Sequence, residues 1–281
     1  MLKKIYLEIS NCCNLACSFC HGTARKPRMM SAAEFEAITE AVRGRAEYLY
    51  FHLMGEPLLH PELPGFIVSA AGKGFRPVVT TNGTLLAERK EELLSTPLYK
   101  INISLHSAEA NAGVRQAEYL ENCIRFAQPA AAGGILTVFR LWNKGGQDEN
   151  NDAIQEVLRE AYPQKWGKTR SGFRLADRTF LEFGERFEWP DTGAGEYGEE
   201  LFCWALRDQI GILCDGSVVP CCLDADGEMT LGNLFREDLD TILSSERARR
   251  IYDGFSAHRA VEELCRKCGY AAVTKKHRAR G

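Results

Sequence analysis

Short apolar runs rich in β-branched and aromatic residues alternate with amphipathic stretches over the first two thirds of the chain. An apolar run bounded by turn residues predicts a buried strand, and an apolar position every three or four residues predicts a helix. The predicted strands are Ile5–Ser10, Tyr48–Leu53, Pro77–Asn82, Ile101–His106, Ile135–Trp142 and, less regularly patterned, Phe173–Phe187. The best marked helix begins at Ser31, because Ser31 and Glu34 form an S-x-x-E capping box.

Strands that alternate with helices at this spacing predict right-handed βαβ units and a parallel sheet, the α/β class. Five or six such units are too few for a closed barrel of eight. From about Trp189 the chain changes, since PDTGAGEYGEE is rich in glycine and acidic residues and is typical of a linker. Its G-x-G-x-x-G spacing lacks a preceding strand and a following helix, so we reject a dinucleotide site. We predict one domain at residues 1–190 and a second at residues 191–281.

Charge and hydropathy argue against nucleic acid and membranes as partners. The 35 basic and 38 acidic side chains give a net charge of −3, which provides no general attraction to nucleic acid or acidic membranes. The basic terminal run KKHRARG reads as a solvated tail more readily than as a nucleic-acid arm. No apolar run approaches the ~18 residues that span a bilayer, and the first residues lack a signal-peptide pattern. We therefore expect a cytoplasmic protein with no membrane partner.

The chain has 11 cysteines, which is many for a reducing compartment, where such clusters more often bind metal than form disulfides. Ten of them fall into two groups, Cys12, Cys13, Cys17 and Cys20 near the start, and Cys203, Cys214, Cys221, Cys222, Cys265 and Cys268 in the last third. The remaining one, Cys123, lies in a helical pattern and is expected to be a small buried side chain.

The first group contains Cys13-x3-Cys17-x2-Cys20 directly after the first predicted strand. Three thiolates on one short loop can hold three irons of a cubane cluster and leave the fourth iron open to a small molecule with amino and carboxylate groups. A structural zinc site is the alternative, with His21 as a fourth ligand. Cys12 falls outside the spacing and is expected to be an accessory or packed thiol.

This segment resembles the radical S-adenosylmethionine (SAM) superfamily, whose C-x3-C-x2-C motif has an aromatic residue before the last cysteine, here Phe19. Further segments are similar to the family in the same order along residues 5 to 143. They are Gly55 and Glu56, with Met54 in place of the family's first glycine, then Thr81 and Asn82 in T-N-G, Ser104 in S-L-H, and Arg140 in F-R-L-W-N.

The resemblance implies a partial (β/α)6 TIM-type barrel and two cofactors, SAM and the [4Fe–4S] cluster that binds it. It implies that Glu56 and the backbone freed by Gly55 receive the SAM amino group, and that Ser104 and Arg140 approach its carboxylate. One electron from the reduced cluster would cleave SAM to methionine and a 5′-deoxyadenosyl radical, which removes hydrogen from a substrate. An electron donor such as flavodoxin or ferredoxin is implied as a partner.

The second group resembles the auxiliary-cluster extension called SPASM, or its shorter twitch form. The matching features are Cys203, a D-G-x-V-x-P-C hairpin that ends at Cys221, a Gly232-Asn233-Leu234 segment, a helix such as Asp240–Tyr252, and Cys265-x2-Cys268. The resemblance implies a small cysteine-rich domain in which Cys203, Cys221, Cys265 and Cys268 hold one auxiliary [4Fe–4S] cluster. Cys214 and Cys222 are reserves, and Cys221 and Cys222 point to opposite faces if that stretch is extended. A zinc site with four thiolates is the alternative.

Three hypotheses for function follow. The first is a radical SAM enzyme that modifies a peptide or protein side chain, since relatives with this extension commonly act on peptides. The second is RNA modification, but no aromatic residues interleave with a basic stripe, as single-stranded RNA binding favours. The third is a non-catalytic metal-binding or electron-transfer protein, which has no need of Gly55, Glu56 or an open iron. His106, at the end of the fourth strand, is the candidate catalytic residue, either for proton transfer or as a pocket wall.

Overall fold

The computed structural model describes residues 2–111 and 113–278, with side chains as far as residue 273, so no side chain of the basic tail KKHRARG is described. The sheet order is β11-β10-β9-β1-β2-β3-β4-β5-β8-β7-β6. Its parallel part in the first two thirds of the chain consists of β1 (Leu2–Leu7), β2 (Ala46–Tyr50), β3 (Arg76–Thr81), β4 (Lys100–Ser104), β5 (Leu136–Lys144) and β8 (Thr179–Glu185). These six strands confirm the partial (β/α)6 barrel.

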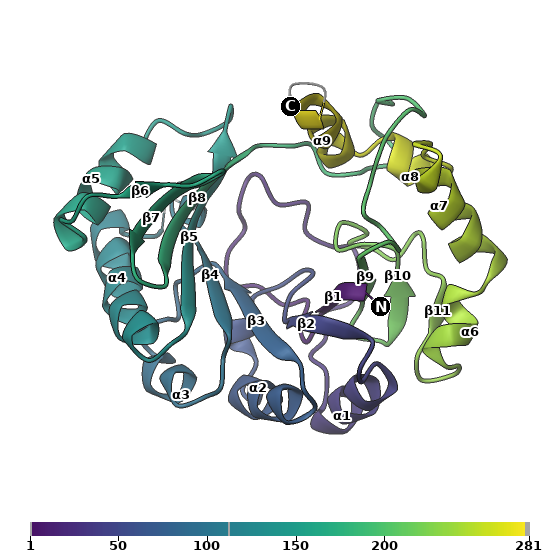
Figure 1. Cartoon of the computed structure of the whole chain (residues 1–281), viewed down its shortest axis with the longest axis horizontal. Coiled ribbons are helices and arrows are strands. Elements are labelled where there is room, and N and C mark those ends of the chain that lie inside the picture. Colours follow the sequence, from purple (N-terminus) through teal and green to yellow (C-terminus); the bar gives the residue numbers. More distant parts are fainter. Residues whose placement is uncertain (1, 112, 279–281) are drawn as a thin grey trace.

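Helices connect the parallel strands and cover the outside of the curved sheet (Figure 1). They are α1 (Ala32–Ala41), α2 (Leu63–Gly72), α3 (Lys90–Leu94), α4 (Gln116–Ala132) and α5 (Asn151–Ala161), with short 3₁₀ turns η1 (Pro57–Leu59) and η2 (Leu105–Ser107). The capping box predicted for α1 is present, because Ser31 Oγ accepts from Glu34 N and the Glu34 carboxylate accepts from Ser31 N.

Two predicted elements differ from the structure. The stretch Phe173–Phe187 is a hairpin of β7 (Gly172–Ala176) and β8, and the turn between them has Arg178 at φ 52°. Only β8 joins the parallel sheet, while β6 (Gly167–Lys168) pairs with β7. The single helix expected at Asp240–Tyr252 is two helices, α6 (Leu239–Leu243) and α7 (Glu246–Ser256), because Ser245 caps a new N-terminus by accepting from Ala248 N.

The two faces of the barrel sheet differ in character. Side chains alternate along a strand, so each strand sends one set outward and one set inward. The outward set is apolar and fully buried against the helices, as for Ile5, Leu49, Ile101 and Phe139. The inward set is polar and aromatic, and comprises Lys4, Tyr6, Tyr50, His52, Thr80, Ser104, Arg140 and Trp142, which line one cavity. A polar interior of this kind is suited to holding a ligand.

The last third of the chain extends the same sheet. Strand β9 (Gln209–Ile212) pairs in parallel with β1, and β10 (Ser217–Val219) and β11 (Gly232–Asn233) continue from it in antiparallel pairing. The segment ends with α8 (Glu263–Arg266) and α9 (Gly269–Arg278). Hydrogen bonding of β9 to β1 fixes the second cysteine group beside the open edge of the barrel. Within the described residues, no helix is both long and apolar enough to cross a lipid bilayer.

Candidate functional site

Cys13, Cys17 and Cys20 lie on the irregular connection between β1 and α1 (Figure 1). Cys13 and Cys20 are exposed and Cys17 is partly exposed, and all three are free thiols. Their loop is closed by a backbone hydrogen bond from Cys20 N to Cys17 O at 3.0 Å. The sequence motif therefore places three accessible sulfur atoms on one short turn.

Each of these sulfur atoms accepts hydrogen bonds from N–H groups. Leu15 N donates to Cys13 Sγ and Gly22 N donates to Cys20 Sγ, both at 3.4 Å. Asn111 Nδ2 donates to Cys17 Sγ at 3.1 Å, and its Oδ1 accepts from Ala16 N at 3.2 Å. Hydrogen bonds to sulfur set the potential of iron–sulfur clusters, so this donor set fits a thiolate-bound cluster. Sequence reasoning missed Asn111, which follows η2 in a segment with no motif.

Gly55 packs directly against the cysteine loop. Its φ is +78°, and a Cβ atom at this position would lie 2.3 Å from Ser10 O and 2.8 Å from Cys12 O. The next residue, Glu56, donates its N–H to Cys12 O at 2.8 Å. Only glycine allows this backbone approach. Met54 is accommodated in place of a glycine because the positive φ falls on Gly55.

Glu56 is almost fully buried, and its carboxylate accepts three hydrogen bonds. Leu58 N and Thr81 Oγ1 donate to Oε1 at 3.0 and 2.7 Å, and Asn82 N donates to Oε2 at 2.7 Å. Burial nevertheless raises the pKa of Glu56 to about 7. Thr81 and Asn82 thus hold Glu56 in place, and neither of them lines the barrel cavity. Asn82 Nδ2 also points at Cys13 Sγ, at 3.8 Å.

The other predicted cofactor residues line the cavity itself, namely Phe19, Gly55, Ser104 and Arg140. His106 joins them, with its ring 4.9 Å from that of Phe19. His106 Nδ1 lies 3.1 Å from Arg140 O, an acceptor, and 3.4 Å from Trp142 N, a donor, so these two contacts do not fix which ring nitrogen carries the proton. Burial lowers the pKa of His106 to about 4, so the imidazole is neutral at pH 7.

The second cysteine group forms another wall of the same cavity, with Cys203, Cys221, Cys222, Cys265 and Cys268 among its lining residues. Burial and then the neighbouring thiols Cys203, Cys222, Cys265 and Cys268 raise the pKa of Cys221. The influences on Cys222 include Lys4 and Tyr6 and, as for Cys221, Cys203. The choice of Cys221 as the ligand, with Cys222 as a reserve, stays a prediction. Cys214 lies apart, with Sγ 3.1 Å from Glu8 O.

Among the described residues, no three His, Cys, Asp or Glu side chains converge closely enough to hold a single metal ion. In a cubane cluster each thiolate binds a different iron, so its ligands need not converge on one point. Ala205 N donates to Cys203 Sγ at 3.4 Å, the same type of contact as on the first loop. Both cysteine groups therefore offer donor sets that fit clusters.

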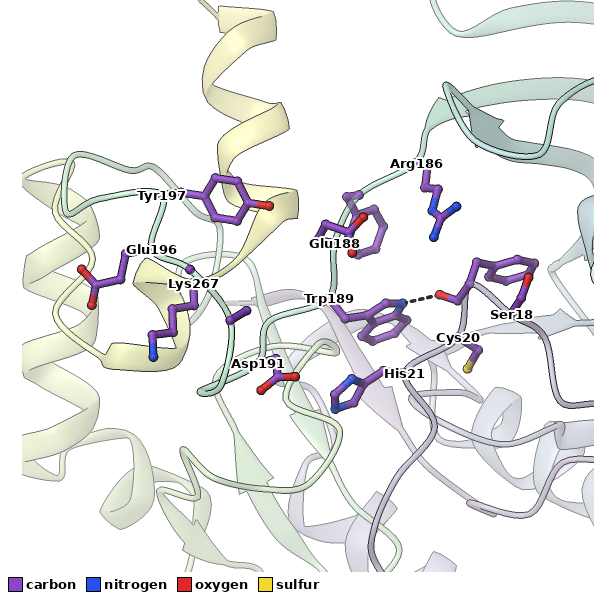
Figure 2. A pocket seen from close by; sticks show the side chains of 14 residues that line it. Ser18, Cys20, His21, Arg186, Glu188, Trp189, Asp191, Glu196, Tyr197 and Lys267 are labelled. Carbon is purple, nitrogen blue, oxygen red and sulfur yellow. Dashed lines mark hydrogen bonds between the residues drawn. The ribbon is translucent and has the colours of Figure 1, made fainter.

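The cavity has a volume of about 400 Å³ and adjoins a more open groove of about 530 Å³. Five residues line both spaces, Phe19, Cys20, Arg186, Phe187 and Trp189. Figure 2 shows the groove, with Tyr197, Glu196 and Lys267 on one side and Ser18, Cys20 and His21 on the other. Trp189 stands between them and donates from Nε1 to Phe19 O at 3.0 Å.

The cysteine loop is also tied to the last third of the chain. Thr23 Oγ1 donates to Asp226 Oδ1 at 2.6 Å, and Ala24 N donates to the same oxygen at 2.8 Å. Arg25 Nε donates to Ala225 O at 2.9 Å. Neither Arg25 nor Asp226 belongs to a motif, so sequence reasoning missed this connection between the two cysteine regions.

Comparison with known proteins agrees with this geometry. Residues 7–128 match the Radical SAM superfamily, and residues 203–269 match the iron-sulfur cluster-binding domain SPASM. A probable GTP 3′,8-cyclase from Sulfolobus acidocaldarius is 31% identical, over 89% of this chain and 91% of that protein.

Two solved structures share the fold. BtrN in complex with AdoMet and 2-DOIA superposes with a TM-score of 0.60 at 18% identity, over 95% of this chain and 93% of BtrN. Streptococcus suis SuiB bound to precursor peptide SuiA superposes with a TM-score of 0.59 at 16% identity, over 96% of this chain and 70% of SuiB.

These matches decide between the alternatives left open by the sequence. The cofactors are SAM, the [4Fe–4S] cluster that binds it and an auxiliary iron–sulfur cluster, so the zinc alternatives are set aside. The third hypothesis, a non-catalytic metal-binding protein, is wrong, because the relatives are enzymes. This chain belongs to the radical SAM superfamily and carries a C-terminal iron–sulfur cluster-binding domain of the SPASM type.

Proposed function

We propose that this enzyme modifies a side chain of a peptide or protein. The observation that carries the proposal is that the outer groove adjoins the inner cavity and shares five lining residues with it. A small molecule needs only the inner space, whereas a peptide needs a cavity for the reacting side chain and a groove for the residues on either side of it. The groove in Figure 2 begins at Cys20 and thus at the radical-generating loop.

In this proposal Cys13, Cys17 and Cys20 hold the SAM cluster, and Cys203, Cys221, Cys265 and Cys268 hold the auxiliary cluster. When bound, the first cluster supplies the electron that cleaves SAM to a 5′-deoxyadenosyl radical. Gly55 and Glu56 receive the SAM amino group, with Thr81 and Asn82 keeping the Glu56 carboxylate in position. Ser104 approaches the SAM carboxylate from the end of β4.

Phe19 and His106 form the wall between the cysteine loop and β5. Nδ1 of His106 already contacts Arg140 O and Trp142 N, so Nε2 is the ring nitrogen left for a substrate group. A neutral imidazole with a depressed pKa is a poor acid at pH 7. The proposed role of His106 is therefore to form a hydrogen bond with a substrate group and orient it.

A second candidate is a radical reaction on a small nucleotide-like molecule. The Sulfolobus acidocaldarius relative is named as a GTP 3′,8-cyclase, and the cavity contains the cationic side chains of Lys4 and Arg140, which suit phosphate. No observation of comparable weight favours RNA modification. A cytoplasmic location and an electron donor such as flavodoxin or ferredoxin remain predictions.

One experiment separates the two candidates. Cells grown in D2O on a deuterated carbon source supply a tryptic peptide fraction and a nucleotide fraction. Each fraction is incubated anaerobically with the cluster-loaded enzyme, SAM and dithionite, and 5′-deoxyadenosine is analysed by mass spectrometry. Deuterium in the product with the peptide fraction supports the proposal. Deuterium only with the nucleotide fraction would replace it with the second candidate. Enzyme lacking Cys13, Cys17 and Cys20 is the control.

A further inference from the structure

Arg140 is a cation buried inside the barrel without a matched partner. Its side chain is 12% exposed and lines the cavity. Among the described residues, its Nε atom has no hydrogen-bond partner, and the nearest carboxylate oxygen, Glu182 Oε2, lies 3.9 Å away. This separation is beyond hydrogen-bond distance, and a buried guanidinium that lacks such contacts is costly.

Two lysines increase the positive charge around Arg140. Lys4 on β1 lines the same cavity, and Lys100 occupies an inward position on β4. Burial, followed by Arg140 and Lys4, lowers the pKa of Lys100. Burial, Arg140 and Lys4 also lower the pKa of His52 to about 3, and no described group bonds to His52 Nδ1. The carboxylates that oppose these cations are Glu182 and the partly buried Asp208.

The carbonyl of Arg140 lies 3.1 Å from His106 Nδ1, beside Phe19 of the first cysteine loop, whereas the charge of its side chain is influenced mainly from the auxiliary side of the cavity. The groups that act most strongly on its charge are Glu182, Tyr50, Tyr6 and Cys222. They belong to β8, β2, β1 and the second cysteine group, and not to the loop of Cys13, Cys17 and Cys20. The Trp142 ring lies 4.4 Å from the guanidinium carbon and covers one face of it. Nε itself is covered by protein, so a ligand would meet the guanidinium at its terminal nitrogens.

We propose that Arg140 and Lys4 form a subsite for an oxyanion, a carboxylate or phosphate carried by the substrate, between the SAM-binding loop and the auxiliary cysteines. Arg140 offers donors in a planar fork that matches two oxygens of such a group, and Lys4 offers a second positive charge. The subsite deepens the proposed function and rests on it for the identity of the substrate. This subsite replaces the expectation that Arg140 binds the SAM carboxylate. We assign the contact with that carboxylate to Ser104 alone.

The test uses the cluster-loaded protein under anaerobic conditions, with and without saturating SAM. Melting temperature is measured against increasing inorganic phosphate, sodium acetate or, at equal ionic strength, sodium chloride. An anion that binds the folded protein raises the melting temperature with its concentration. We expect phosphate, acetate or both to exceed chloride, and the response to persist with SAM present. Acetate assigns the subsite to a carboxylate, and phosphate without acetate assigns it to a phosphoryl group.

Variants show whether the response belongs to Arg140. Arg140→Met should weaken anion binding about tenfold, because one charge-assisted contact is lost. Arg140→Lys should bind the anion with an affinity between those of the wild type and Arg140→Met, because it keeps the charge but loses the planar fork. Arg125→Met is the matched control, since Arg125 is exposed on α4 and pairs with Glu121. Without anion, Arg140→Met should melt no lower than the wild type, because an ill-matched buried charge has been removed. If it folds poorly, Lys4→Met is titrated instead, with the same expected loss.

Three results would overturn the subsite: no response above chloride in the wild type, a response in Arg140→Met and Lys4→Met as large as in the wild type, or a wild-type response abolished by SAM. The last would return Arg140 to the SAM carboxylate. The titration needs no substrate, so it can succeed while the deuterium-transfer test of the peptide proposal fails, and the reverse also holds.

Discussion

Arg25 forms a bidentate ion pair with Glu8, in which Nη1 and Nη2 donate to Oε1 and Oε2 at 2.8 and 2.7 Å. The Glu8 carboxylate is fully buried and also receives Met54 N and Cys214 N, each at 3.2 Å. One carboxylate thus contacts three segments: Arg25 after the cysteine loop, Met54 before Gly55, and Cys214 after β9. The Arg25–Glu8 ion pair therefore connects the SAM-binding region to the auxiliary region.

Arg25→Met is expected to lower the free energy of unfolding by about 3 kcal/mol, because it leaves the Glu8 charge buried without its partner. Chemical denaturation of the cluster-free protein measures the loss. Arg43→Met is the control, since Arg43 and its partner Glu40 are both more than half exposed and such pairs contribute little. Equal stability of the two variants would show that the Arg25–Glu8 ion pair does not stabilise the folded protein.

Replacing Cys13, Cys17 and Cys20 by alanine should abolish 5′-deoxyadenosine formation from SAM and dithionite after anaerobic reconstitution, because no thiolate remains to hold the SAM cluster. Cys12→Ala should retain it, since Cys12 lies outside the motif spacing and its Sγ contacts are weak, at 3.9 Å. Undiminished product from the triple variant would refute the assignment of these three cysteines.

Much of the barrel could be predicted from the sequence. Each strand has apolar side chains on its outward face and turn residues at its ends, and both features are visible as a local pattern. The first four predicted strands are displaced toward the C-terminus, as Ile5–Ser10 is β1 at Leu2–Leu7, whereas the predicted Ile135–Trp142 ends before β5 does. Lys3 and Lys4 broke the apolar run there, yet they belong to the strand, and Lys4 points into the polar barrel interior. A search for apolar runs cannot find strand positions that face a ligand cavity.

The candidate site was predictable where residues adjacent in sequence carry the chemistry, as in the cysteine loop and at Gly55 and Glu56. Contacts between distant segments were not. Asn111 reaches Cys17 across 94 positions, and Thr23 reaches Asp226 across 203. The first contact depends on the order of strands β1 to β4 in the sheet and the second on the pairing of β9 with β1, neither of which a local pattern encodes. Thr81 and Asn82, predicted to bind the cofactor, contact Glu56 and the cysteine loop and do not line the cavity.

Glu56→Gln should weaken SAM binding about tenfold while leaving the iron content unchanged, because it removes a charge near the SAM amino group and no cluster ligand. Equilibrium dialysis of radiolabelled SAM with the reconstituted protein measures the affinity, and iron analysis is run on the same sample. Glu62→Gln, at an exposed position before α2, is the control. Loss of iron from the Glu56 variant would mean that Glu56 supports the cluster loop and does not act on SAM.

The stability of the protein without SAM should fall as pH rises toward neutrality on account of Glu56. Burial raises its pKa from 4.5 to about 7, so between these values the folded protein keeps a proton that the unfolded chain has released. The stabilisation is fully present below 4.5 and is lost as pH passes about 7. Glu56→Gln should remove this dependence, which amounts to roughly 3 kcal/mol. Denaturation of both proteins across this range is the measurement, and parallel curves would contradict the shifted pKa.

The auxiliary cluster can be examined alone in the variant that lacks Cys13, Cys17 and Cys20. We expect about four irons and four sulfides per chain and the EPR signal of a reduced [4Fe–4S] cluster. Both should disappear when Cys265 and Cys268, which neighbour Cys221 in the cavity wall, are also replaced by alanine. Cys222→Ala should retain them, because the surroundings of Cys222 include Lys4 and Tyr6. If Cys222→Ala loses the iron and Cys221→Ala keeps it, Cys222 is the cluster ligand and Cys221 is the reserve. Iron kept without Cys265 and Cys268 would place the auxiliary cluster on other residues.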